Sequence, residues 1–536
     1  MRSVPLKRHS ERFSQRRRSL MSKQKHHVHS SLRMDNFLQR VSRHARQSDS
    51  VVSLCIYSLL HARVIPLAYT VVITAMLYLA SLALVGGAYA TTSSPQVIVE
   101  HVTDLGVFNG QHYLQVEGLM VGTFPRPGSE IPGSYRVPLI MAFPVGNIDD
   151  HDHAGRPGNG VGLVDVPNSA AFEVTPGPTL TEEDIFQLGI IAMGDYLFRE
   201  GYTYLSVQWS QTVTKSLGAD PPSGRRRLLG YGVIEDASDK TQILRDASHL
   251  LRHPIFLQDI GTLKPVEHVL ALGYSQTGRE VSNFIRAGSN QQADGLSYDG
   301  FAIVANIAPS SRPFPQGQGK IISLYTETDL VFFPFRGHRD RASTALEDYR
   351  HYELAGVAHI PQPINPLDAL GATRQNPADF APVLRAIIAN LVAWIRHGDS
   401  PPPSRFIEGT ILPNGGFVPE RDADGNALGG LRLPHMPSVL CDESSDEDDC
   451  RAAGAPLGTY TGLEPNFPVP PFTNLSVHLG GTFESFSPQQ LTERYRNQGH
   501  YVTLVRRAAQ ALRKQGYILQ EDYRTYVREA AQQPLR

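Results

Sequence analysis

The sequence predicts an α/β fold in which a mainly parallel central sheet is flanked by helices. From residue 160 onward, short apolar stretches alternate with helical patterns, which is typical of a parallel sheet. A glycine-bounded turn at 273–278 joins a buried stretch directly to a helical one. Polar side chains then follow two later apolar stretches, at 326–329 and at 359. Since parallel strands end at one edge of a sheet, these groups are expected to meet there.

The first ordered elements are expected to be antiparallel strands. Between residues 96 and 140, short alternating runs are interrupted by Gly and Pro, a pattern of strands joined by turns. The later strands of the sheet are expected at 160–166, 202–208, 266–272, 301–307, 320–325 and 351–355.

Helices are expected between and after these strands, at 181–200, 240–252, 279–287 and 380–397. The helix at 380–397 is the best marked, because its apolar residues recur every three or four positions and Gly398 provides a stop. Residues 406–536 are interpreted as a C-terminal extension of the same domain, packed on the core. It is loop-rich to about residue 485 and then helical, with one helix capped by Ser487.

The N-terminal part differs in charge from the rest. Residues 1–63 carry 14 Lys or Arg against three acids, whereas 64–536 carry 36 basic and 49 acidic residues. Residues 64–90 contain no formal charge, which is long enough for a membrane-crossing helix. The basic side of such a helix stays in the cytoplasm. We therefore expect a disordered cytoplasmic leader at 1–63, a transmembrane or signal segment at 64–90, and an exported domain at 96–536.

Two alternatives for the N-terminus stay open. Ala88-Tyr89-Ala90 matches a signal-peptidase site, so the chain is either anchored in the membrane or cleaved after Ala90 and released. The basic arm alone would also suit nucleic acid, but the apolar segment after it favours the membrane interpretation. In an oxidising compartment, Cys441 and Cys450 are able to pair across the acidic loop between them.

Ser275 is the candidate nucleophile. It is central in Gly273-Tyr274-Ser275-Gln276-Thr277-Gly278, between a buried strand and a helix, where a nucleophile can stand on a tight turn. The motif is one residue longer than the usual G-x-S-x-G, because Thr277 takes the second glycine position and Gly278 follows it. A base and an acid are expected later in the chain, in the order Ser, acid, His.

His359 is the expected base, since it follows the last strand. His351 lies inside that strand and His338 in a charged loop, so both are weaker candidates. Glu327 and Asp329 follow the 320–325 strand and either is able to turn toward His359; Asp329 is the preferred acid. The oxyanion hole is expected to use the backbone N–H of Gln276 and one from the loop after 160–166, for which Asn168 is named.

These motifs resemble a recognisable group, the bacterial "alpha/beta hydrolase domain" proteins. The resemblance rests on residues 273–279, Phe284, 298–300, 326–329, 352–359 and 422–434. It covers most of 96–530 and implies the α/β-hydrolase fold in one continuous domain. It also implies Ser275 as nucleophile, His359 as base and Asp329 as acid. One departure occurs at 158–168, where Val164-Asp165-Val166-Pro167-Asn168 replaces the usual V-E-W-x-N strand end.

The expected activity is that of a serine esterase acting on a small-molecule carboxylic ester through an acyl-enzyme, without a cofactor. Acyl transfer or peptide hydrolysis by the same residues is an alternative, and so is an inactive membrane-tethered binding module. A metal site at 149–153, an Asp- and His-rich loop, is the less favoured interpretation of that segment. No nucleic-acid partner is expected.

Overall fold

The computed structural model describes most of the chain after residue 93. The described residues are 94–126, 128–129, 131–145, 158–167, 193, 196–209, 233–234, 239–254, 266–306, 312–331, 341, 343–360, 376–413, 416–440, 451–462 and 479–535. They fall within one compact unit, Ala90–Arg536. Among them, no helix combines the length and apolarity needed to cross a membrane. The leader at 1–63 and the segment at 64–90 lie outside the described residues.

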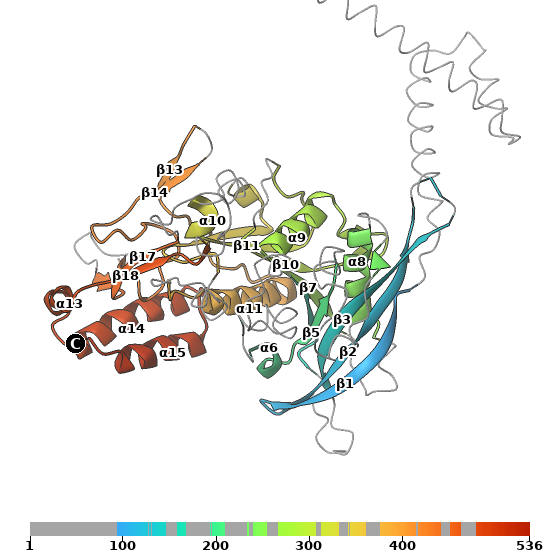
Figure 1. Cartoon of the computed structure of the whole chain (residues 1–536), viewed down its shortest axis with the longest axis horizontal. Coiled ribbons are helices and arrows are strands. Elements are labelled where there is room, and N and C mark those ends of the chain that lie inside the picture. The colour runs from blue at the N-terminus through green and yellow to red at the C-terminus, as the bar shows by residue number, and fades with distance from the viewer. Residues whose placement is uncertain are drawn as a thin grey trace, which may run out of the picture. The chain divides into compact units, whose positions relative to one another are not determined.

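A ten-stranded sheet forms the centre of this unit (Figure 1). Its order is β1-β2-β3-β5-β4-β7-β10-β11-β12, with β6 paired to β3. The bounds are β1 Gln96–Phe108, β2 Gln111–Phe124, β3 Gly133–Val145, β4 Val161–Val166, β5 Thr203–Val207, β6 Val233–Ile234, β7 His268–Tyr274, β10 Gly300–Val304, β11 Lys320–Thr326 and β12 Tyr349–Leu354.

The six strands from β5 to β12 pair in parallel, which confirms the predicted mainly parallel sheet. β4, β5 and β10 are buried along their whole length, because helices cover both faces of this part of the sheet. All six therefore end at the same edge, where β7, β11 and β12 each lead into a segment that carries a predicted site residue.

The antiparallel strands predicted at the start are also confirmed, and they are longer than the sequence pattern suggested. β1 pairs with β2 and β2 with β3 over their full lengths. β1 alternates between exposed and half-buried residues, as expected for an edge strand with one face toward the core. This part lies at the opposite side of the sheet from β12, so it frames the site without contributing a residue named for it.

Helices cover the two faces of the sheet with separate apolar clusters. On one face, α8 (Asp239–Arg252) and α9 (Gln276–Arg286) contribute Ile243 and Phe284. On the other face, α6 (Tyr196–Arg199) and α11 (Ala381–His397) contribute Leu197 and Leu384. The helices predicted at 240–252 and 380–397 are confirmed; of the one predicted at 181–200, only residue 193 and α6 with its end are described.

The described part of the C-terminal segment adds small sheets and three helices. Its elements are β13 Gly409–Ile411, β14 Phe417–Pro419, β15 Ser438–Leu440, β16 Arg451–Ala453, β17 Gly458–Thr461, β18 Thr482–Ser485, α13 Pro488–Arg494, α14 Gln498–Lys514 and α15 Gln520–Gln532. A short hairpin, β8 Gln291–Gln292 with β9 Gly295–Leu296, follows α9.

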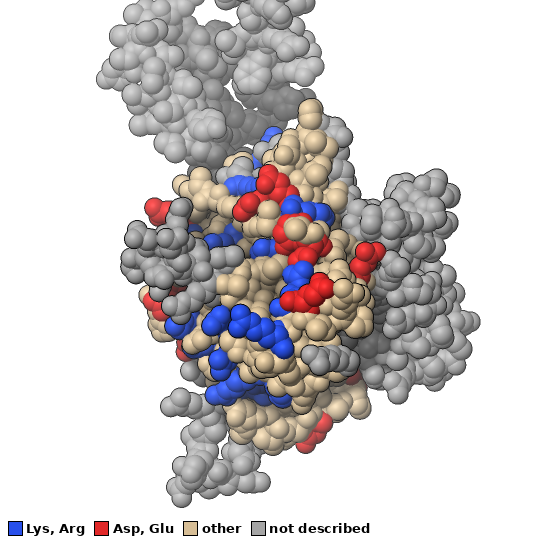
Figure 2. Space-filling view, turned by 90° about the vertical axis from the view of Figure 1, so that its left-hand side faces the viewer, with Lys and Arg blue, Asp and Glu red and all other residues tan. Residues whose placement is uncertain are grey.

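This segment joins the sheet at its β12 edge, where Tyr352 bridges to Arg405 and Leu354 to Leu431. On the face that the C-terminal elements present, acidic and basic side chains lie side by side above and basic ones gather below (Figure 2). Arg494 pairs with Asp424 across two elements, while Arg506 and Arg507 are exposed on α14. We interpret this as a solvated charged face, on which local ion pairs contribute little to stability.

Candidate active site

Ser275 occupies the sharp turn between β7 and α9. Its φ of 57° and ψ of −114° lie in a region that non-glycine residues rarely adopt, a strain found where a nucleophile is presented at a strand-to-helix turn. Its backbone N–H donates to the carbonyl of Val304 at the end of β10, 2.9 Å away. The adjacent strand thus fixes the strained turn, and the side chain is only 7% exposed.

The residues around Ser275 explain why the motif is one position longer than usual. A Cβ on Gly278 would lie 2.9 Å from the Val304 carbonyl oxygen, and one on Gly273 would lie 2.6 Å from that of Thr277. Thr277, by contrast, fits and holds the turn: its Oγ1 accepts from the Tyr274 N–H and donates to the Tyr274 carbonyl. The position at which the backbone comes closest to β10 is therefore 278, and this is the position that needs the second glycine.

His359 lies against Ser275. It follows β12 after a short turn, and its Nε2 is 2.9 Å from the Ser275 Oγ. The imidazole is buried, with 2% of the residue exposed. Since 84 residues separate the two in the chain, only the parallel pairing of β7, β10, β11 and β12 brings them together.

Asp329 lies on the other side of His359. Its Oδ1 is 2.5 Å from His359 Nδ1, and its Oδ2 accepts from both the backbone N–H and the hydroxyl of Thr326. The carboxylate is fully buried. Asp329 lies in a helical turn, α10 (Glu327–Val331), which directly follows β11 and is closed by the bonds to Thr326.

Glu327, the other acid considered, turns away from His359. Its Oε1 accepts from Arg421 at 2.6 Å and its Oε2 from the N–H of Gly356 at 2.8 Å. Because it sits two positions before Asp329 on a helical turn, the two carboxylates point in different directions. Glu327 thus fixes the segment that leads to His359, while Asp329 contacts the imidazole.

Two further residues hold His359 and carried no signal in the sequence. Thr328 Oγ1 accepts from the His359 N–H at 3.0 Å and donates to the carbonyl of Gly462. Tyr274 donates from its hydroxyl to the His359 carbonyl, and its ring stacks on the imidazole. Both contacts join segments far apart in the chain, so no local pattern marks them.

Of the two competing histidines, the structure describes His351, and its ring contacts groups other than Ser275. His351 is buried within β12, where its Nε2 binds Glu353 and its Nδ1 binds the hydroxyl of Tyr349. Glu353 also binds Arg341, so His351 belongs to a separate polar network. His338 lies outside the described residues.

Of the two residues predicted for the oxyanion hole, the structure describes Gln276. Gln276 is the first residue of α9, so its backbone N–H lies at the N-terminus of an 11-residue helix, where the helix dipole favours negative charge. Asn168 lies outside the described residues, as do the 149–153 loop and the Cys441 and Cys450 pair. Within the part of the chain that is described, no group of three or more potential metal ligands occurs.

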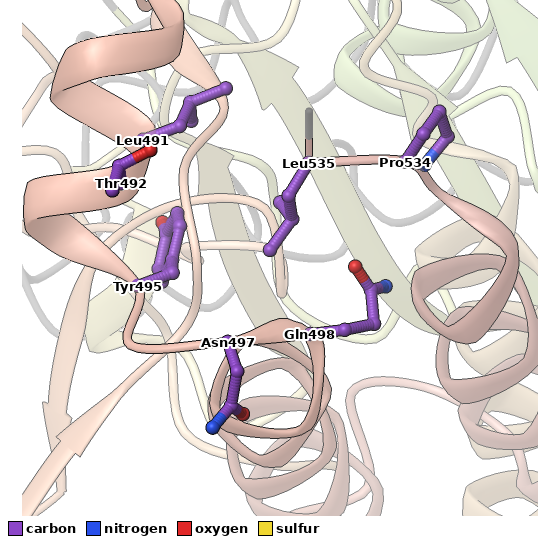
Figure 3. A pocket seen from close by; sticks show the side chains of 7 residues that line it. All are labelled: Leu491, Thr492, Tyr495, Asn497, Gln498, Pro534 and Leu535. Carbon is purple, nitrogen blue, oxygen red and sulfur yellow. The ribbon is translucent and has the colours of Figure 1, made fainter.

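A hollow of about 420 Å³ opens elsewhere, among C-terminal elements (Figure 3). It is lined by Leu491, Thr492, Tyr495, Asn497, Gln498, Pro534 and Leu535. Its polar groups already have partners: Tyr495 donates to Pro456, Gln498 donates to Ala530, and Asn497 caps α14. None of the lining residues comes from the elements that carry Ser275, Asp329 or His359, so the hollow is separate from that site.

Comparisons with known proteins bear on the family of this chain. A family described as "Alpha/beta hydrolase domain" matches residues 184–528, more than half of the chain. No curated protein matches.

Among solved structures, the ferulic acid esterase of Streptomyces cinnamoneus is 13% identical, with a TM-score of 0.29, covering 50% of this chain and 85% of that one. The rice cell wall degrading esterase LipA of Xanthomonas oryzae is 12% identical, with a TM-score of 0.24, covering 39% of this chain and 50% of that one.

Proposed function

Because this chain belongs to the alpha/beta hydrolase domain family, we propose that it hydrolyses a carboxylic ester with Ser275 as nucleophile, His359 as base and Asp329 as the acid that orients it. One observation carries the proposal: a buried chain of hydrogen bonds runs from the Ser275 Oγ through both nitrogens of His359 to Asp329. A serine is a poor nucleophile alone, and this arrangement is the one that activates it.

In the first half of the reaction, the Ser275 Oγ attacks the ester carbonyl while its proton moves to His359 Nε2. The Asp329 carboxylate accepts the Nδ1–H bond and stabilises the imidazolium that forms. Negative charge develops on the former carbonyl oxygen, and the N–H of Gln276 at the start of α9 is placed to stabilise it. The C–O bond to the alcohol breaks, His359 returns the proton to the alcohol, and the acyl group stays on Ser275.

In the second half, water replaces the alcohol. His359 takes a proton from the attacking water, and the new C–O bond forms as the bond to the Ser275 Oγ breaks. The proton returns to Ser275, the carboxylic acid leaves, and the free enzyme is restored. Thr326 keeps Asp329 in place through both halves, since the same carboxylate oxygen accepts its N–H and its hydroxyl.

The place of action is part of the proposal and rests on the sequence alone. The uncharged segment at 64–90 follows a basic leader, which favours export of the domain, either tethered to the membrane or released after Ala90. Its substrate is proposed to be a small-molecule ester, and no cofactor takes part in the steps above.

Hydrolysis of short-chain p-nitrophenyl esters by the purified protein tests the proposal. We expect Ser275→Ala to lower kcat by about 10⁶-fold, since losing the nucleophile leaves only binding and oxyanion stabilisation. Ser282→Ala is the matched control, because Ser282 is a buried serine on α9, the helix that follows Ser275, and its hydroxyl accepts from Asn306 instead of contacting His359. Equal rates for Ser275→Ala and the unchanged protein would refute the assignment.

A further inference from the structure

Tyr274, the residue before the proposed nucleophile, contacts His359 in two ways. Its ring centroid is 5.4 Å from that of the imidazole, with 28° between the planes, so the two rings are stacked. Its hydroxyl donates to the backbone carbonyl of the same histidine, 85 residues away in the chain. One side chain thus contacts both the ring and the backbone of His359.

The phenol of Tyr274 is held firmly and stays neutral. Thr277 binds its backbone N–H and carbonyl, and Phe380 lies on its ring with centroids 5.9 Å apart. Burial, together with the nearby charge of Asp329, raises the pKa of the Tyr274 hydroxyl well above its usual value. A neutral ring with an electron-rich face therefore lies beside the imidazole throughout the working pH range.

We propose that Tyr274 is a positioning residue for His359: its ring face stabilises the imidazolium that forms during acyl transfer, and its hydroxyl fixes the backbone that carries the imidazole. The inference rests on the proposed function, because only a histidine that accepts the Ser275 proton becomes charged. A cation over an aromatic face is stabilised more where it is shielded from water, and the imidazole of His359 is buried against the half-buried ring of Tyr274.

The other polar groups near His359 contact the edge of its ring or are paired elsewhere, so Tyr274 is the group on its face. Asp329, from α10, binds its Nδ1, and Ser275, from the turn after β7, lies at its Nε2. Glu327, also on α10, is paired with Arg421 and bound to the Gly356 N–H, so its charge is directed away from the imidazole. Asp329 and Tyr274 thus stabilise the imidazolium from its edge and from its face.

Two substitutions separate the contributions of the ring and the hydroxyl. Tyr274→Phe keeps the stack and removes the bond to the His359 carbonyl, so we expect kcat to fall about fivefold with KM unchanged. Tyr274→Leu removes both, so we expect a fall of about 100-fold. With the charged imidazole less stable, the acid limb of the kcat/KM profile should move to lower pH in Tyr274→Leu and stay in place in Tyr274→Phe.

Tyr113→Phe is the matched control, since Tyr113 is buried and donates to the Tyr202 carbonyl on the antiparallel side of the sheet. This control should leave kcat and the acid limb of the kcat/KM profile unchanged.

The inference is overturned if Tyr274→Leu folds and keeps the wild-type kcat, or loses activity with no movement of the acid limb. If Tyr274→Leu does not fold, Tyr274→Phe decides, and a wild-type kcat overturns the inference. A fully active Ser275→Ala would instead show that the proposed function itself is wrong.

Discussion

Glu327 and Asp329 lie two positions apart in the chain, yet only Asp329 contacts His359. The sequence identified both carboxylates at the end of the same strand and preferred the second. Spacing alone did not separate them, because either side chain is able to turn toward His359 from the end of the strand. A helical turn at α10 sends Asp329 toward His359 and Glu327 toward Arg421.

Exchanging each carboxylate for its amide tests this distinction. Asp329→Asn should lower kcat by about 10⁴-fold, because the amide no longer holds the imidazole in the productive tautomer. Glu327→Gln is the matched variant: it keeps the shape of a side chain that contacts Arg421 and Gly356, so kcat should fall less than about 10-fold. Steady-state kinetics of both proteins give the answer, and the reverse ranking would show that Glu327 is the acid.

The meeting of Ser275 and His359 could be predicted from the sequence, because each follows an apolar strand and parallel strands end at one edge of a sheet. The contacts of Tyr274, Thr326 and Thr328 could not be predicted. They depend on backbone geometry at the turns: Thr328 reaches the His359 N–H only because α10 lies against the segment after β12. No rule of sequence spacing predicts a contact between residues this far apart in the chain.

At the level of elements, α8 could be predicted from the sequence as a helix, but its buried polar contact could not. Its helical pattern at 240–252 was readable, and the structure confirms it as Asp239–Arg252. The buried Asp246 on this helix was not anticipated. It accepts from the hydroxyl of Tyr135 on β3, 111 residues earlier, and from Gln242 one turn before it. A periodic pattern locates a helix but not the strand that covers it.

Asp246 makes stability depend on pH. Burial raises its pKa from 3.8 to about 6, although bonds from Tyr135 and Gln242 act in the opposite direction. A carboxyl whose pKa is raised by folding favours the folded state below its unfolded value, and this contribution is lost as the pH rises to about 6. Asp246→Asn should therefore gain about 2 kcal/mol relative to the unchanged protein between pH 4 and pH 7.

Urea denaturation at several pH values measures this gain. Asp294→Asn, at an exposed carboxyl, is the control and should follow the unchanged protein at every pH. If the difference between Asp246→Asn and the unchanged protein were constant from pH 4 to pH 7, the buried carboxyl would not be the source of the dependence.

At the scale of the whole molecule, Glu353 joins the C-terminal segment to the sheet. It is fully buried in β12 and binds His351, Arg341 and the N–H of Ile407. Arg341 in turn stacks on Phe406 and Phe417. The sequence indicated that residues 406–536 extend the hydrolase domain, but this network of charged groups carries no motif, since its members come from three separate segments.

Glu353→Gln should destabilise the protein by about 3 kcal/mol, because Arg341 is left without its charged partner in a largely buried place. Thermal and urea unfolding measure the loss. Glu408→Gln is the control, since Glu408 is exposed in the neighbouring segment and its change should be within about 0.5 kcal/mol. Equal stability of the two variants would show that the network does not fasten the C-terminal segment.

The covalent state of Ser275 during turnover tests the central claim most directly. The protein is incubated with a p-nitrophenyl ester or a fluorophosphonate, digested, and analysed by mass spectrometry. We predict that the peptide containing residues 273–278 gains the mass of one acyl or phosphonyl group, and that Ser275→Ala gains none. A modified residue elsewhere, or hydrolysis with Ser275 never modified, would contradict the account.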